Sequence, residues 1–482
     1  MNKKQLWAFY TPSHTVDYIL SRVDIVSKID KNSKILEPSW WDWAFVSSLL
    51  SSYDVNPKNI DVWDINIEVK ENILNYWVNF FCKDSLLESG ILSESLFTTD
   101  EWIYSHVVWN PPYLNKQSDY IKNNKHKLKK LYSSIGVYDT YAMFIYLGSR
   151  LLKKWWCLGF IVSDTFLTLW IHKNFRKYIL DNFTVREITL CQKNLFEWAA
   201  VSTCIIIIEN KKPAEDSRFI INNCRHTPIW QYNGIVTECS QKDTLNNPDY
   251  VFDINNNPSL LKMTNSNDKM VDYLDWWLWM HTKNNNKYLS VIDYDWTNFA
   301  KKKTIPNMIS SKEIDGKNWI FYHKQWWWFK YYLPAEYAVK WDKDSVSNYV
   351  IPKNALWLKD KKWFIISWVC SSLSSRLSTP WAMRESNKAM CFFPKNQDYP
   401  CEYFVWLLNS SCYARLMKTL NHTNSIQIRD IYKLPMIHLK GKDKENLINY
   451  VKIIINWMKS DLEFDYSEYQ QKIDKIVEKY FN

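Results

Sequence analysis

Residues 107–113 read Val-Val-Trp-Asn-Pro-Pro-Tyr, an apolar β-type run followed at once by a Pro-Pro corner. Proline fixes φ and has no N–H, so the strand ends here and a rigid turn follows. Other apolar β-type runs alternate with helical stretches across the first half of the chain, at residues 35–36, 60–65, 157–163 and 201–208. This alternation predicts an open, mostly parallel sheet with helices on both faces. In such sheets ligands bind beyond the carboxyl ends of the strands.

Length and composition bound the rest of the architecture. The 482 residues correspond to roughly three domains of ~150 residues, and the 46% hydrophobic and 23% charged residues are typical of a globular protein. The net charge of +10 is compatible with a polyanionic partner. We expect an α/β domain over residues 1–215, a connecting segment over 216–270, an aromatic and basic α+β domain over 271–440, and a helical segment over 441–482.

Several classes of protein are not favoured by the sequence. The polar start of the chain does not resemble a secretory signal, and no apolar run approaches the ~18 residues of a membrane span. The ten cysteines form no C-x-x-C pair, so neither a zinc site nor a disulfide framework is expected. We therefore expect a cytoplasmic protein without a metal centre.

Glycine and tryptophan occur in unusual numbers, 7 and 28. A chain of this length normally has roughly 34 glycines. Many tryptophans also stand where turns need glycine, for example in Trp40-Trp41-Asp42-Trp43 and Trp326-Trp327-Trp328. Our hypothesis is that most of them are glycines encoded by UGA and translated with a code that reads UGA as tryptophan. Trp341 and Trp457 are candidates for genuine tryptophans. The alternative is a protein with real aromatic clusters.

The tetrapeptide Asn110-Pro111-Pro112-Tyr113 resembles the catalytic motif of amino-group methyltransferases that use S-adenosylmethionine. The amine of adenine is a poor nucleophile because its lone pair is delocalised into the ring. The Asn110 side-chain oxygen and the Pro111 carbonyl can each accept one amine hydrogen, which would direct the lone pair at the methyl donor. Pro112 keeps the corner rigid, and Tyr113 offers a face on which an extruded base can stack. The alternative is an ordinary turn after a strand.

A second segment resembles the cofactor loop of the same enzymes. Residues 35–45 combine an apolar run, Glu37-Pro38, and a bend that is glycine-rich if Trp41 and Trp43 are glycines. Glycines let the backbone approach a cofactor, and the following helix N-terminus favours a carboxylate. As printed, the two indoles would fill that space. Further candidate cofactor ligands are Asp64, for ribose hydroxyls, and Asp84, near the adenine, with Asp100 as the alternative for the second role. An aspartate at a strand end often only forms a turn.

Three other segments complete the resemblance. Thr11-Pro12 is similar to the segment that closes over the methionine part of the cofactor, although Thr and Pro also commonly start helices. Phe196 is a candidate second aromatic contact for the target base, or else a core residue. Lysines that follow the catalytic motif could contact DNA phosphates, or simply be solvated; they are Lys122, Lys125, Lys127, Lys129 and Lys130.

Together these segments resemble the γ-type adenine-N6 DNA methyltransferases of restriction–modification systems, close to the TaqI and Eco57I group. The resemblance covers residues 7–210 and, more loosely, the second half. It implies a class I S-adenosylmethionine-dependent methyltransferase domain over 1–215 and a target-recognition domain over 271–440. It also implies base flipping in double-stranded DNA and direct methyl transfer to adenine N6. We expect a monomer that works with a separately encoded endonuclease.

Other functions remain open. Protein-glutamine and RNA N-methyltransferases also carry Asn-Pro-Pro-Tyr, but are usually shorter. If the printed tryptophans are real and fill the cofactor pocket, the chain would be a DNA-binding module without activity. A combined nuclease is not favoured, because no Asp/Glu-x-Lys follows Pro248-Asp249 within thirty residues.

Overall fold

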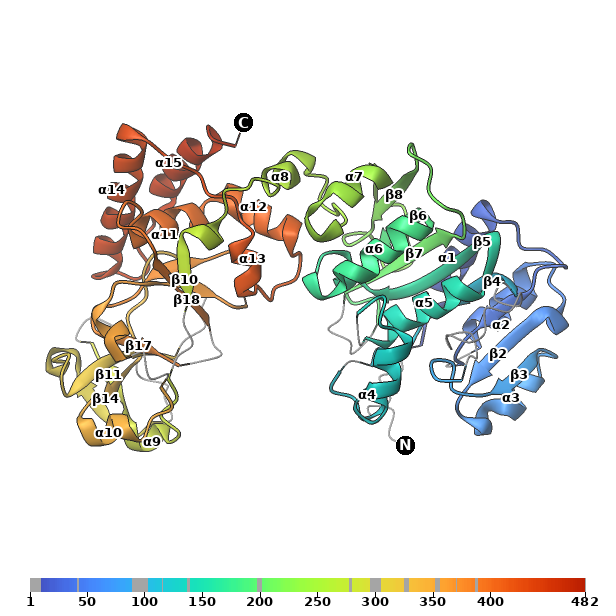
Figure 1. Cartoon of the computed structure of the whole chain (residues 1–482), viewed down its shortest axis with the longest axis horizontal. Helices are drawn as coiled ribbons and strands as arrows, with labels where there is room; N and C mark the ends of the chain where they lie inside the picture. The colour runs from blue at the N-terminus through green and yellow to red at the C-terminus, as the bar shows by residue number, and fades with distance from the viewer. Residues whose placement is uncertain are drawn as a thin grey trace. The chain divides into compact units, whose positions relative to one another are not determined.

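The computed structural model describes residues 10–40, 43–88, 103–114, 116–136, 139–196, 202–276, 280–294, 305–324, 329–351, 356–369, 371–385 and 389–481. The chain forms two compact units, residues 1–256 and 257–482 (Figure 1). In the part of the chain described, no helix combines the length and apolar character needed to cross a membrane.

A nine-stranded sheet is the centre of the first unit, in the order β3-β2-β1-β4-β5-β7-β6-β8-β9. The neighbouring strands β3, β2, β1, β4 and β5 are all parallel. β7 is antiparallel to both β5 and β6, and β6 is parallel to β8. This confirms the predicted Rossmann-like, mostly parallel sheet. The strands are β1 Ile35–Glu37, β2 Ile60–Asp64, β3 Asn79–Cys82, β4 Tyr104–Trp109, β5 Leu152–Ser163, β6 Thr184–Leu190, β7 Thr203–Glu209, β8 Arg218–Asn223 and β9 Ile235–Ser240.

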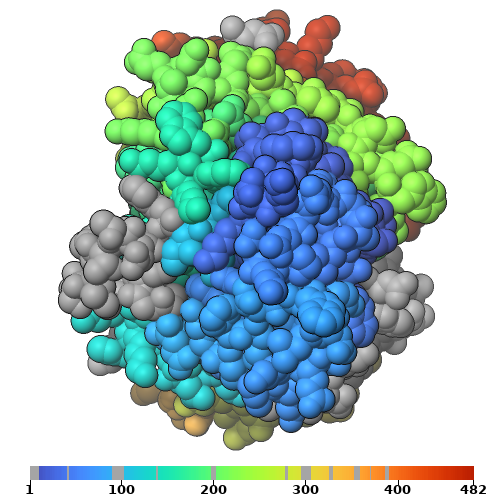
Figure 2. All heavy atoms as spheres, turned by 90° about the vertical axis from the view of Figure 1, so that its right-hand side faces the viewer, coloured from blue at the N-terminus to red at the C-terminus, as the bar shows by residue number. Residues whose placement is uncertain are grey.

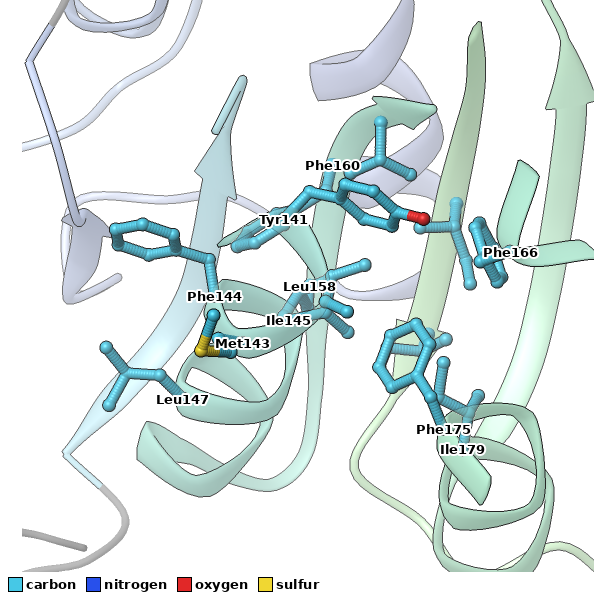
Figure 3. Close-up of a cluster of buried hydrophobic side chains, with 14 of the residues drawn as sticks. Tyr141, Met143, Phe144, Ile145, Leu147, Leu158, Phe160, Phe166, Phe175 and Ile179 are labelled. Carbon is cyan, nitrogen blue, oxygen red and sulfur yellow. The ribbon is translucent and has the colours of Figure 1, made fainter. Parts of the chain in front are cut away.

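Helices cover both faces of this sheet. Along β5 the side chains alternate: Leu158 and Phe160 belong to one apolar cluster, and Cys157 and Ile161 to the other. The first cluster includes side chains of α4, α5 and α6, and the second includes side chains of α1, α2 and α3. Figure 3 shows residues of α5 and α6 packed beside Leu158 and Phe160 of β5 in the first cluster. The helices are α1 Ser13–Val26, α2 Ala44–Ser52, α3 Lys70–Leu74, α4 Asp119–Leu131, α5 Thr140–Leu151, α6 Lys173–Asn182 and α7 Gln241–Asn246.

Gly159 shows how closely α1 approaches the sheet. A Cβ at this position would lie 2.5 Å from Val23 Cγ2 and 3.0 Å from Ile19 Cγ2. Any larger residue would push α1 away from β5.

The boundary of the first unit differs from the expected one. Residues 216–256, expected to belong to a connecting segment, include β8 and β9, which extend the sheet beyond β6. Phe219 and Ile221 of β8 are buried against it. Polar and turn-forming residues around these two short strands mask their apolar pattern in the sequence.

The second unit contains two further sheets, in the orders β10-β18-β15-β16 and β12-β11-β14-β13-β17. Its mixture of sheets and helices agrees with the α+β expectation for this half. The strands are β10 Leu274–Trp276, β11 Leu289–Asp293, β12 Met308–Ser310, β13 Trp319–His323, β14 Tyr337–Lys340, β15 Phe364–Ser367, β16 Ser375–Leu377, β17 Ala382–Arg384 and β18 Ala389–Pro394.

Helices of the second unit are concentrated towards its end. The helical segment expected over 441–482 contains α14, where Leu447, Val451 and Ile454 are buried. The helices are α8 Pro258–Met263, α9 Asn285–Tyr288, α10 Lys343–Ser347, α11 Cys401–Asn409, α12 Ser411–Leu420, α13 Ile428–Tyr432, α14 Gly441–Met458 and α15 Ser467–Glu478.

Candidate active site

Several predicted site residues meet at one edge of the first unit's sheet. β1 lies between β2 and β4 and is parallel to both, so all three strands end at the same edge. Glu37 and Asp64 are the last residues of β1 and β2, and Asn110 directly follows β4. The bend after β1 and the Pro-Pro corner after β4 are therefore neighbours, as a shared site requires.

Asp64 connects the bend to β2. Its Oδ2 accepts a hydrogen bond of 2.9 Å from the Trp40 backbone N–H, and its Oδ1 accepts one of 2.6 Å from the Asn66 N–H. Burial raises the pKa of this carboxyl to about 6, although the hydrogen bonds from Asn66 and Trp40 lower it. A carboxylate has about four acceptor sites, so it could also accept ribose hydroxyls.

Glu37 and Pro38 form the start of the bend. Glu37 is buried, and the Pro38 carbonyl accepts a hydrogen bond of 2.6 Å from Ser85 Oγ. Trp43, which precedes α2, is 54% exposed. Trp41 lies outside the described residues.

Asp84 is held by its own turn. Its Oδ1 accepts hydrogen bonds from the N–H groups of Leu86 and Leu87, at 3.0 and 3.1 Å, and from Tyr120 Oη at 2.9 Å. Ser85, its neighbour, contacts Pro38, so the turn lies beside the bend after β1. Asp84 thus makes the contacts of a turn-forming aspartate, which was the alternative role expected for it. It also lies next to the candidate cofactor loop.

Thr11 contacts the catalytic motif directly. Its Oγ1 accepts a hydrogen bond of 3.0 Å from Asn110 Nδ2, and both side chains are buried. Pro12 follows and precedes the first residue of α1. With its nitrogen held on the Thr11 side, the Asn110 carboxamide has its oxygen on the opposite side.

Tyr113 and Phe196 differ in their surroundings. Tyr113 is half-buried; its Oη donates to the Ile161 carbonyl at 3.2 Å, and its ring centre lies 6.5 Å from that of Tyr141. Phe196 is 6% exposed and packs in the apolar cluster on the α1 face of the sheet. Its packing is that of a core residue, at the edge where β6 ends.

The loop between β8 and β9 reaches the same edge, which the sequence did not indicate. Tyr232 stacks on Tyr18 of α1, with ring centres 4.1 Å apart, and donates a hydrogen bond of 2.8 Å to Thr15. Figure 2 shows this side, where the green segment around β8 and β9 lies against the dark-blue α1. Arg225 pairs with Asp164, which directly follows β5, at 2.7 Å. Asp164 could have been identified as an edge residue, because it directly follows a predicted strand. No sequence pattern indicated that Arg225 would lie at this edge.

The matching part of the sequence includes the bend after β1 and the Pro-Pro corner. Residues 38–196, which run from the bend after β1 to Phe196, match the Eco57I restriction-modification methylase family. The chain contains an Eco57I restriction-modification methylase domain. In this methylase domain, the Pro-Pro corner and the bend after β1 are the segments brought together by the sheet.

The chain is also similar to curated proteins. The Type II methyltransferase M.HincII of Haemophilus influenzae is 25% identical over 234 residues, covering 47% of this chain and 41% of that protein. M.BstVI of Geobacillus stearothermophilus is 26% identical over 213 residues, covering 38% and 37%. The match thus spans about two fifths of the length of these relatives.

A solved structure has a similar fold over most of the chain. A nuclease-deletion mutant of the Type ISP restriction-modification enzyme LlaGI, solved with a DNA substrate mimic, aligns with a TM-score of 0.57. The alignment covers 93% of this chain and 54% of that one, at 13% identity. The fold outside the methylase domain is therefore also found in a restriction-modification enzyme.

Proposed function

We propose that the chain transfers a methyl group from S-adenosylmethionine to adenine N6 in double-stranded DNA, after base flipping, as part of a restriction–modification system. The observation that carries this proposal is the hydrogen bond from Asn110 Nδ2 to Thr11 at the tip of β4. It fixes the carboxamide so that its oxygen faces away from Thr11, towards the position proposed for the target amine. The methylase family and the Type II relatives support the reaction class.

The residues of the edge fit a cofactor beside the amine. S-adenosylmethionine, when bound, supplies the electrophilic methyl group. Asp64 would hold the ribose hydroxyls, Asp84 the adenine end, and the bend from Glu37-Pro38 to Trp43 the methionine part together with Thr11-Pro12. The buried carboxylate of Asp64, whose hydrogen bonds leave acceptor sites, fits this role.

The chain's own groups would then arrange the target amine. Asn110 Oδ1 and the Pro111 carbonyl each accept one hydrogen of the amine, which directs its lone pair towards the donor. Tyr113 provides the face against which the flipped base lies. Phe196, which packs as a core residue, is not assigned to the base. The second unit would read the DNA sequence, a separate endonuclease would cleave unmodified DNA, and the protein would act as a cytoplasmic monomer.

Methyl transfer to unmethylated genomic DNA tests the proposal. The chain as printed and a recoded form, in which each UGA-encoded tryptophan is replaced by glycine, are incubated with methyl-labelled S-adenosylmethionine. We expect N6-methyladenine at one short sequence. Product as N4-methylcytosine, methylated RNA or methylglutamine would contradict the proposal, and binding of DNA without any transfer in either form would favour the inactive DNA-binding module.

Substitution of the motif tests the roles of its residues. Asn110→Ala or Tyr113→Ala should lower kcat by about 100-fold or more, since each removes a contact made to the reacting base. The Kd for S-adenosylmethionine, measured by calorimetry, should stay within about threefold. Asn182→Ala, at the end of α6, is the matched control and should keep full activity. Unchanged methylation by Asn110→Ala would contradict the assignment.

A further inference from the structure

Thr140, the first residue of α5, contacts the catalytic motif on both sides of Tyr113. Its Oγ1 donates a hydrogen bond to the Pro112 carbonyl and accepts one of 3.0 Å from the Leu114 N–H. Its backbone N–H donates to the Leu114 carbonyl at 3.0 Å. One side chain thus joins the residue before Tyr113 to the residue after it.

The motif needs such an external partner. Pro111 and Pro112 have no N–H, so the corner cannot be held by hydrogen bonds from its own proline nitrogens. Thr140 is 1% exposed, so water does not compete for these contacts. The position of the Pro112 carbonyl, and with it the direction of the neighbouring Pro111 carbonyl and of the Tyr113 ring, depends on this hydroxyl.

The residues on either side of Thr140 are themselves fixed. Tyr141 Oη and Asp139 Oδ2 both lie close to His172 Nε2, at 3.0 and 3.4 Å. His172 is buried, and burial lowers its pKa to about 3. The first turn of α5 is therefore attached to the segment before α6, which gives Thr140 a rigid base.

We propose that Thr140 is a positioning residue that sets the Pro-Pro corner and the Tyr113 ring for the target base, without touching the base or the methyl donor. This inference rests on the proposed function. It assigns a role to a residue that the motif does not include, and it attributes the rigidity of the motif to a specific hydroxyl as well as to its prolines.

The test compares three variants. Thr140→Val removes the hydroxyl and keeps the shape, Thr140→Ser keeps the hydroxyl, and Thr184→Val removes a matched buried hydroxyl that donates to the Lys211 carbonyl at the opposite edge of the sheet. The single-turnover rate of methyl transfer is measured at saturating S-adenosylmethionine and DNA. We expect a loss of about 10- to 100-fold for Thr140→Val, because small misplacements of a reacting group have effects of that size. Thr140→Ser and Thr184→Val should stay within about threefold, and the Kd for S-adenosylmethionine should not change.

Either of two rates would overturn the inference, a Thr140→Val rate equal to wild type or a Thr140→Ser rate as low as that of Thr140→Val, and so would one result of hydrogen exchange. Hydrogen exchange at the Leu114 amide separates this inference from the proposed function. Thr140→Val should speed that exchange at least tenfold, since it removes the acceptor, while Thr184→Val should not. If the wild-type protein methylates no DNA, the proposed function fails. The exchange of the Leu114 amide still tests Thr140 in that case, and an unchanged exchange rate in Thr140→Val would overturn its positioning role.

Discussion

Backbone conformation bears on the identity of the tryptophans. Trp77, Trp155 and Trp381 have φ values of 62°, 72° and 50°, in the left-handed region that favours glycine. Their side chains are 80%, 62% and 47% exposed, so core packing does not account for indoles at these positions. These observations support the hypothesis that such tryptophans are glycines in the natural protein.

Stability measurements can test this hypothesis at single residues. Trp77→Gly should raise the free energy of unfolding by about 1 kcal/mol, because glycine removes the cost of a left-handed conformation. Trp457 is the control, since it is also exposed but lies in the last turn of α14, where its ring stacks on Phe464. Trp457→Gly should lower stability by about 1 kcal/mol, because glycine has a low helix propensity and the stacked ring is lost. Urea unfolding followed by circular dichroism checks both; a loss of stability in Trp77→Gly would argue that this indole is native.

Asp64 predicts a pH dependence of stability. Its pKa is about 6 in the folded protein, above the ordinary value of 3.8, because burial favours the neutral carboxyl. The folded state therefore binds the proton more tightly than the unfolded state. The resulting stabilisation is complete below about pH 4 and is lost as the pH rises through 6. Between pH 4.5 and 7.5 this one group should lower the free energy of unfolding by about 1 to 2 kcal/mol.

The variant Asp64→Asn isolates that contribution. The amide does not titrate, so the difference in stability between pH 4.5 and 7.5 should be smaller than in the wild type by the same amount. Asp139, whose pKa burial also raises to about 6, remains in both proteins and cancels. Equal pH dependence in the two proteins would show that Asp64 is not the group responsible. The variant should also weaken the binding of S-adenosylmethionine if the carboxylate holds the ribose.

Among the elements, α4 is the candidate for contact with the DNA backbone. Ile121 and Leu128 anchor it to the core, while Lys125, Lys129 and Lys130 are exposed. Its position just after the catalytic motif would place these charges beside a flipped nucleotide. Lys122 differs, because it lies 3.7 Å from Asp119 in an exposed pair.

Charge reversal on α4 tests this surface. Lys125→Glu combined with Lys129→Glu should weaken DNA binding at least tenfold and reduce the slope of log K against log salt by about 2, one for each lost phosphate contact. Lys153→Glu combined with Lys154→Glu changes the charge equally at the start of β5, the opposite edge of the sheet, and should leave both quantities nearly unchanged. A similar loss of DNA affinity in both double variants would indicate a general effect of net charge. The lysines of α4 would then be solvated side chains that do not contact phosphates.

The elements also show what the sequence could and could not predict. Apolar runs and the Pro-Pro corner were sufficient for β1, β2, β4 and β5 and for the edge where they end, since strand periodicity and proline geometry are local properties. The hydrogen bond of Thr11 to Asn110 spans almost a hundred residues, and no local pattern encodes it. Thr140 and Arg225 were missed for the same reason. Short, polar strands such as β9 carry too weak a pattern to be separated from a loop.

At the scale of the whole molecule, the position of the unit boundary has a measurable consequence. β8 pairs with β6, and Phe219 and Ile221 pack against the sheet. The buried guanidinium of Arg176 donates two hydrogen bonds, of 3.1 and 2.9 Å, to the Asp249 carbonyl. A fragment that stops at residue 215 loses both, which exposes the β6 edge and leaves a buried cation without these acceptors.

We therefore predict that the fragment 1–256 folds and the fragment 1–215 does not. The longer fragment should unfold cooperatively in urea, because it keeps the whole nine-stranded sheet, and it should bind S-adenosylmethionine as the full chain does. The shorter one should aggregate or lack a cooperative transition. In 1–256, Arg176→Met should be tolerated better than Arg176→Ala, since methionine fills the space of the buried stem without a charge. If the 1–215 fragment is soluble, unfolds cooperatively and binds the cofactor, β8 and β9 are not needed for folding. The folding unit would then end at residue 215.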